Sequence, residues 1–170
     1  GVGAAGGRAA GGRGGPAEAL RLLSPLLASD PDNAALWTLL SEAHHDAEAY
    51  PQALEAAVRA VRADPHSGQA QFFLALGVWN THVLGRNPRW GAARRHARQA
   101  QDALRSAIAL TPFHPGYRVT LAQLVLQTGG TAEARTLLTR ALELHPHSTH
   151  ALVTLAELAL KLSLIHISEP

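Results

Sequence analysis

Residues 34–67 read AALWTLLSEAHHDAEAYPQALEAAVRAVRADPHS, and the fold can be predicted from this segment. Four of its residues recur at the i, i+3, i+4 and i+7 positions that share one helical face: Trp37, Leu40, Ser41 and His44. Small residues then follow at helical intervals: Ala53, Ala57 and Ala60. Pro65 ends this second segment, because proline cannot continue a helix without losing a hydrogen bond. The stretch therefore predicts two antiparallel helices joined by a short turn.

Prolines repeat this pattern along the chain. Pro31, Pro65, Pro112 and Pro146 are separated by 34, 47 and 34 residues. A self-similar unit of about 34 residues that closes with proline is typical of a helix-turn-helix solenoid, in which each unit packs against its neighbours. Because solenoids of this kind generally bind partners, we predict an all-α binding module with one enlarged helix pair.

The residues at equivalent places in each unit resemble the tetratricopeptide repeat (TPR) superfamily. Residues 34–67 fill its large, small, aromatic and proline positions, with His44 in place of one aromatic residue. The unit that ends at Pro146 matches again, and departs from the pattern at Arg118 and Thr131. Small residues are expected where the two helices of a pair approach closely. The resemblance implies a right-handed superhelix of antiparallel helix pairs.

The composition agrees with a helical domain. Hydrophobic residues make up 46% and charged residues 16% of the 170 residues, as in ordinary globular proteins. Aromatic residues are only 5%, which disfavours a β-sandwich or barrel. The sequence has no cysteine, which excludes disulfides and thiolate metal sites. Because it also lacks a signal-peptide core and an apolar run near the roughly 18 residues that cross a bilayer, we expect a cytoplasmic protein.

The repeat pattern divides the chain into three regions. Residues 1–15 are rich in glycine and are expected to be a flexible lead-in. Residues 163–170 break the pattern and resemble a translated sequencing-adapter tail; since an initiator Met is also absent, we expect a fragment. Pro25 is expected to kink the first helix or to start a shorter one. The solenoid is expected to comprise a partial repeat 16–33, repeat 34–67, extended repeat 68–114, repeat 115–148 and partial repeat 149–162.

The TPR resemblance also implies a binding surface. The first helices of the pairs line a concave groove, and the inward positions are filled here by Thr38, Glu42, His45, Gln69, Phe72, Trp79, Gln123 and Gln127. This groove would suit an extended peptide or a partner helix, with Phe72 and Trp79 as apolar anchors. The alternative is that both aromatic residues only pack between repeats.

TPR proteins that bind chaperone C-terminal tails clamp a carboxylate with lysine, asparagine and further basic residues. The corresponding positions of this chain carry Thr38, Glu42, Val119 and Gln123. We therefore do not expect it to bind a chaperone C-terminal tail.

The 47-residue unit is the individual feature of this chain. Its 13 extra residues fall between the two helices. Gly85 to Pro88 predicts a turn, after which the second helix is expected to extend back to about Trp90. The insertion and this extension are basic, with a patch formed by Arg86, Arg89, Trp90, Arg94, Arg95 and Arg98.

Three interpretations of this basic patch stay open. The first is a solvated helix face, with Trp90 packed on the solenoid. The second is a docking patch for an acidic protein or an anionic membrane. The third is an RNA site in which Trp90 serves as a stacking platform. Nucleic acid is the least expected partner, because the net charge of +2 is mild.

Within the superfamily, the extended unit resembles the tetratricopeptide repeat protein seven scaffold family. The resemblance rests on residues 74–77, the added segment and residues 107–112, in that order. It implies membership of a membrane-recruited complex around the type III alpha phosphatidylinositol 4-kinase.

The sequence contains few patterns that are typical of catalytic or metal-binding sites. His145, His147 and His150 are close in sequence, but they fall on a repeat turn without a cysteine, and we expect no metal site. No phosphate-binding loop, nucleophile elbow or His-Glu-X-X-His pattern occurs. We therefore expect a non-catalytic scaffold without a cofactor that recruits protein partners. The alternative is a TPR arm of a larger glycosyl- or sulfotransferase.

Overall fold

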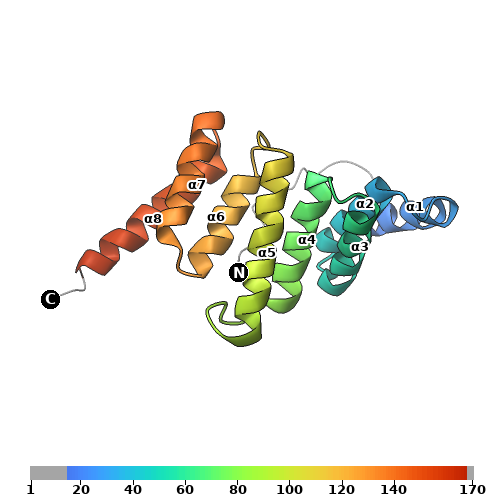
Figure 1. Cartoon of the computed structure of the whole chain (residues 1–170), viewed down its shortest axis with the longest axis horizontal. Helices are drawn as coiled ribbons and strands as arrows, with labels where there is room; N and C mark the ends of the chain where they lie inside the picture. The colour runs from blue at the N-terminus through green and yellow to red at the C-terminus, as the bar shows by residue number, and fades with distance from the viewer. Residues whose placement is uncertain (1–14, 168–170) are drawn as a thin grey trace.

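The computed structural model describes residues 15–167, and within this range all regular secondary structure is α-helical. The helices are α1 (Pro16–Ser29), α2 (Ala34–Asp46), α3 (Tyr50–Ala63), α4 (Gly68–His82), α5 (Gly91–Leu110), α6 (Tyr117–Gln127), α7 (Thr131–Leu144) and α8 (Thr149–Ile167). They lie side by side in chain order along the longest axis of the molecule (Figure 1). Each helix contacts the next one, and α2 also contacts α4 as α6 contacts α8. The predicted all-α solenoid of helix pairs is confirmed.

Three complete pairs, α2/α3, α4/α5 and α6/α7, stand between α1 and α8. Helix α1 runs through Pro25 without starting a second helix. Helix α8 continues past Leu162, where the repeat was expected to end, as far as Ile167. Residues 1–14 of the expected lead-in and 168–170 of the expected tail lie outside the described residues.

The turns that close the repeats have one common structure. The residue before each repeat proline ends the preceding helix with φ between −136° and −142°: Asp30, Asp64, Thr111 and His145. The proline itself explains this, because its ring disfavours the α conformation for the residue before it. In three of the four turns, the residue two positions after the proline caps the next helix with its side-chain oxygen: Asn33, Ser67 and Ser148. The proline spacing therefore sets the helix boundaries.

The structure explains why Arg118 is compatible with the repeat although it departs from the sequence pattern. In the first complete pair, Trp37 Nε1 donates a hydrogen bond to the carbonyl oxygen of Pro31 at 2.7 Å. Arg118 occupies the equivalent position and donates to the carbonyl oxygen of Pro112. The two side chains differ in type but tie the first helix of their repeat to the same point of the preceding turn.

Small residues occupy the positions where the paired helices meet. Nine buried residues recur with the spacing of the prolines, and we call them the small-residue interface: Ser41, Ala53, Ala60, Ala75, Ala100, Ala107, Ala122, Ala134 and Ala141. Ser41 Oγ donates to the carbonyl oxygen of Ala53 at 2.8 Å, which joins α2 to α3 directly. Such an approach between helix backbones is possible only where side chains are small.

Neighbouring pairs also approach closely, at Gly77. A Cβ atom at Gly77 in α4 would lie 2.9 Å from Leu54 Cα in α3, which is closer than such atoms can come. The contact is to backbone, so that one helix would have to move.

We predict that Gly77→Ala destabilises the protein by about 1–3 kcal/mol, because the added methyl group overpacks the contact between α3 and α4. Urea unfolding followed by circular dichroism measures the change. Gly116→Ala is the matched control, since its Cβ would meet only the His114 ring at an ordinary 3.5 Å. Equal unfolding midpoints for Gly77→Ala and the wild type would contradict the close approach.

The turns within two pairs share a left-handed residue. Gly129 has φ of 93° and Glu48, at the equivalent position of the first complete pair, has φ of 57°. Glycine adopts this conformation without strain, whereas a residue with a Cβ atom does not. Glu48 is exposed, and its strained backbone therefore costs stability without an evident gain in packing.

We predict that Glu48→Gly stabilises the protein by about 0.5–1 kcal/mol, because relief of the left-handed strain exceeds the added entropy of the unfolded chain. Thermal unfolding should show a rise of about 1–4 °C in the midpoint. Ala47→Gly, at a residue with φ of −82°, should lower it instead. A lower midpoint for Glu48→Gly would show that the left-handed conformation is not strained in solution.

The insertion lengthens α5 without changing this packing. Helix α5 begins at Gly91, beside the predicted start at Trp90, and its first turns bury Ala93 and Ala97 on the face that continues to Ala100. The opposite face of these turns carries exposed arginines. The added turns therefore extend the buried face of α5 back toward the α4–α5 loop, which forms one end of the pair in Figure 1.

Candidate functional site

The structure divides the predicted groove residues into buried and accessible ones. Thr38 is 3% exposed and its hydroxyl donates to the carbonyl oxygen of Ala34. Trp79 is 4% exposed and belongs to the hydrophobic core. Neither side chain can contact a ligand, which corrects their assignment to the binding surface. Trp79 therefore packs within the solenoid, as the alternative interpretation of this residue expected.

Six rings form a continuous row that runs from the start of α3, across α2 and α4, to the start of α6 and the turn before it. In order, this aromatic row consists of Tyr50, His45, Phe73, Phe72, Tyr117 and His114, with ring centroids 5.8, 6.4, 5.4, 4.9 and 3.7 Å apart. The Phe72–Tyr117 and His114–Tyr117 pairs are stacked. Only His45 and Phe72 were predicted as groove residues. Tyr50 was recognised only as an aromatic residue of the repeat pattern, and Phe73 only as part of a helix. Tyr117 and His114 were missed because Tyr117 precedes the patterned positions of its unit and His114 lies in a turn.

A cavity of about 610 Å³ lies beside the aromatic row, between α2, α4 and the start of α6. Three predicted groove residues line it, Glu42, Gln69 and Phe72. The remaining lining residues are Ser67, Gly68, Phe73, Thr111, His114 and Tyr117. The cavity thus combines aromatic walls with one carboxylate, and we call it the aromatic cavity.

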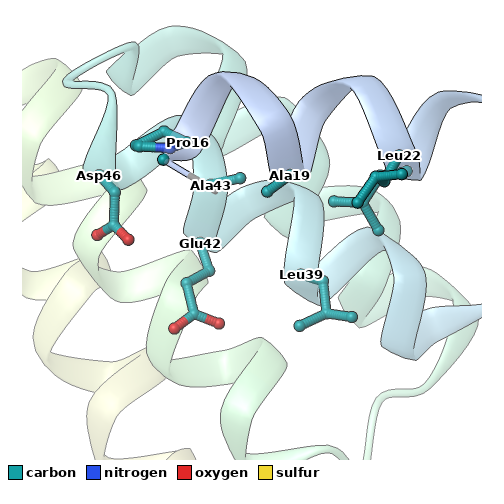
Figure 2. A pocket seen from close by; sticks show the side chains of 9 residues that line it. Pro16, Ala19, Leu22, Leu39, Glu42, Ala43 and Asp46 are labelled. Carbon is teal, nitrogen blue, oxygen red and sulfur yellow. The ribbon is translucent and has the colours of Figure 1, made fainter. Parts of the chain in front are cut away.

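A second cavity of about 370 Å³ lies between α1 and α2 and is mainly apolar, and we call it the apolar cavity. Leu22, Leu23 and Leu39 line it together with Glu42 and Asp46. Figure 2 shows Leu39, Glu42 and Asp46 projecting to the same side of α2. Glu42 lines both cavities, so they adjoin at this residue.

The other predicted groove residues make internal contacts. The amide of Asn80 and Nδ1 of His45 are 3.5 Å apart, which links α2 to α4. Gln123 contacts Nε2 of His150 at 2.8 Å and Thr154 Oγ1 at 3.5 Å, which links α6 to α8. Gln127 is half-buried on the last turn of α6. Gln123 and Gln127 line neither cavity.

Burial lowers the pKa of His45, and the carboxylates of Asp46 and Glu42 offset part of that effect. Burial likewise lowers the pKa of His44, His82 and His114. His44 occupies an aromatic position of the repeat, and its Nδ1 is buried without a hydrogen-bond partner. These histidines therefore serve as neutral packing groups near pH 7.

We predict that the free energy of unfolding falls as the pH drops from 7 to 5. Because the folded pKa of His45 is below its unfolded value, the unfolded state binds the proton first, and stability is lost as the pH falls through the unfolded value near 6.5. His45→Gln should reduce the difference between urea midpoints at pH 7 and pH 5. His66→Gln, at an exposed turn residue, is the control. An unchanged difference in His45→Gln would contradict the role of this ring.

The structure gathers part of the predicted basic patch around a third cavity, of about 390 Å³. We call it the arginine cleft, and its lining consists of Pro88, Arg89, Trp90, Arg94, Arg98, Gln101 and Thr128. Arg86 and Arg95 do not line it; Arg86 instead donates to the carbonyl oxygen of Thr81 at 3.3 Å. Trp90 is 71% exposed, and so it is not packed on the solenoid as one interpretation expected. Gln101 and Thr128 were missed, since their packing depends on where α6 ends.

The histidines near the third repeat turn have separate partners. His145 Nε2 lies 2.9 Å from the carbonyl oxygen of Phe113, while His150 contacts Gln123. Among the side chains that the structure describes, residues 15–164, no three histidine or acidic groups gather closely enough to hold a metal ion. Across residues 15–167, none of the helices has the length and apolar character that a membrane span requires.

A family model described as tetratricopeptide repeat matches residues 5–68, 92–148 and 119–164. The unmatched stretch, residues 69–91, holds most of α4 and the loop of the insertion. No curated protein sequence matches the chain.

Solved structures with a similar fold include several TPR proteins. MamA superposes with a TM-score of 0.70 at 19% identity, covering 88% of this chain and 80% of MamA. TTC0263, a thermophilic TPR protein of Thermus thermophilus, gives 0.68 at 24% identity, covering 85% and 73%. The first TPR of Spaghetti (RPAP3), bound to the HSP90 peptide SRMEEVD, gives 0.64 at 16% identity, covering 76% and 93%. At these identities the similarity shows the fold.

Proposed function

Because the chain belongs to the tetratricopeptide repeat family, we propose that it is a non-catalytic scaffold that binds a partner protein segment in the two cavities that adjoin at Glu42. The segment is amphipathic and basic, either an extended peptide or a helix. The observation that carries this proposal is the position of Glu42, which lines both the apolar and the aromatic cavity.

The chemistry of the two cavities supports a basic, amphipathic ligand. Apolar side chains of the ligand would enter the apolar cavity beside Leu22 and Leu39. A lysine or arginine would lie at Glu42 and Asp46, beside the partly exposed Phe72 ring in the aromatic cavity. No arginine or lysine lines either cavity, so the ligand's cation would meet no like charge there.

The same charges argue against a chaperone C-terminal tail. The peptide bound to the RPAP3 domain, SRMEEVD, is acidic at its C-terminal end. In this chain Glu42 and Asp46 would repel such a segment, while Thr38 and Val119 are buried and cannot clamp a carboxylate. The proposed ligand is therefore opposite in charge to the RPAP3 peptide.

Fluorescence anisotropy tests the proposal with a short labelled peptide that carries leucines on one helical face and arginines beside them. We predict that Glu42→Gln weakens binding by about tenfold, because a charge-assisted hydrogen bond contributes about 1.5 kcal/mol or more. Glu157→Gln, an exposed change of equal charge on α8, should leave the Kd within about twofold.

A twin peptide with glutamate in place of arginine separates charge from general apolar binding. It should bind at least about tenfold more weakly than the basic peptide. Equal losses in Glu42→Gln and Glu157→Gln, or equal affinities for the two peptides, would contradict the proposed site.

A finer proposal concerns the identity of the partner. The order of residues 74–77, the insertion and residues 107–112 supports a cytoplasmic role in a membrane-recruited lipid-kinase complex, through the resemblance to the tetratricopeptide repeat protein seven family. Co-purification of the type III alpha phosphatidylinositol 4-kinase with the chain, lost in Glu42→Gln and kept in Glu157→Gln, would support it. The transferase-arm alternative has no observation in its favour within residues 15–167.

A further inference from the structure

We propose that the arginine cleft is a second protein-binding surface, which takes acidic side chains of a partner segment. It shares no lining residue with the two cavities at Glu42 and is opposite to them in charge. The inference concerns a separate ligand and does not rest on the function proposed above.

The cleft concentrates positive charge that the described part of the chain leaves uncompensated. Arg21, Arg59, Arg105 and Arg140 each form an ion pair with a nearby carboxylate. Within residues 15–164, the three cleft arginines, Arg89, Arg94 and Arg98, form none, and no acidic residue lines the cleft. The nearest acid along α5, Asp102, is paired with Arg105. Three arginines are thus available to an anionic ligand.

Two different elements supply these arginines. Arg94 and Arg98 are one turn apart on α5 and share a helix face. Arg89 comes from the loop before α5, where its guanidinium lies beside Gly129, so close that a Cβ atom there would be 3.4 Å from Nη2. Because the loop and α5 both contribute to the lining, the arginines surround a recess rather than forming a flat charged face.

The floor of the cleft is fixed by hydrogen bonds. Gln101 is buried, and its Nε2 donates to Thr128 Oγ1 at 3.0 Å and to the carbonyl oxygen of Leu124 at 3.4 Å. Thr128 Oγ1 in turn donates to the carbonyl oxygen of Val125 at 2.9 Å. These bonds connect α5 to the end of α6, so the cleft is formed before a ligand arrives.

Trp90 gives the cleft an apolar edge. Its side chain is 71% exposed, which is unusual for the largest apolar residue and marks it as a contact for a partner. An acidic residue in the cleft with an apolar neighbour on the Trp90 ring would use both features. A cavity of about 390 Å³ accommodates one or two side chains.

The geometry favours carboxylates of a protein over a membrane or RNA. Planar guanidinium groups match carboxylates in bidentate pairs, and a recess admits side chains. A lipid surface would instead be met by protruding basic residues. Single-stranded RNA needs several aromatic rings for successive bases, whereas Trp90 is the single aromatic residue that lines the cleft.

Fluorescence anisotropy with the full chain tests this inference. The probe is a short labelled peptide of glutamate and aspartate with one leucine, and its twin carries lysine in place of the acids. Arg94→Glu and Arg98→Glu should each weaken binding of the acidic peptide by at least about tenfold. Arg95→Glu makes the same charge change on the same helix, at an exposed residue outside the cleft, and should change the Kd by less than about threefold.

Trp90→Ala provides an independent check, since it leaves the charge unchanged. It should weaken binding of the acidic peptide and leave binding of a leucine-free version of the peptide unchanged. The basic peptide that binds at Glu42 should be unaffected by Arg94→Glu, so failures of the two sites are distinguishable. Circular dichroism confirms that the variants fold.

Three results would overturn the inference. Equal losses in Arg94→Glu and Arg95→Glu would show a diffuse charge effect without a site. Equal affinity for the acidic peptide and its lysine twin would exclude charge recognition. Tighter, Arg94-dependent binding to phosphatidylserine vesicles or to single-stranded oligouridine would assign the cleft to a membrane or to RNA instead.

Discussion

The close approach of paired helices at small residues is the constraint on which the rest of the structure depends. Ser41, Ala75 and Ala122 take the same place in the first helices of the three pairs, and each is buried with almost no exposed surface. The Ser41 hydroxyl even reaches the backbone of the opposite helix. A larger side chain at any of these positions would push the paired helices apart. The turns and the side-chain rows would then move as well, because their positions depend on the spacing of the helices.

This constraint explains how the chain tolerates an insertion. The added residues leave Ala75 and Ala100 at the positions that their counterparts occupy in the shorter pairs, and they continue the buried face of α5 through Ala93 and Ala97. The part of the α5 backbone that carries Arg94 and Arg98 is therefore held beside the end of α6, to which Gln101 is hydrogen-bonded. The two binding surfaces that we propose are opposite in charge, one built from the common repeat and the other from the feature that distinguishes this chain.

Features that depend on local sequence could be predicted, and features that depend on packing between repeats could not. The prolines predicted the turns because each restricts its own backbone, and the small residues predicted the helix pairs because they recur at fixed helical intervals. Arg118 looked like a departure, yet it makes the contact that Trp37 makes, because a hydrogen bond to a carbonyl needs a donor rather than a particular ring. Repeat position alone placed Trp79 in the groove, while the superhelix buries it. The aromatic row was missed because Tyr117, on which His114 stacks, meets Phe72 only after α4 and α6 have packed.

We infer that α5 is one rigid helix along its whole length, held by the small-residue interface and by the buried Ala93 and Ala97, so that the arginine cleft is preformed. Hydrogen exchange of the backbone amides tests this most directly, because protection reports the stability of each segment. We predict that the backbone amides of residues 95–98, in the inserted turns, are as protected from exchange as those of residues 100–107. The amides of residues 84–90, in the loop, should exchange quickly. Exchange of residues 95–98 as fast as that of the loop would show that the inserted turns are not held by the interface, and would contradict the account.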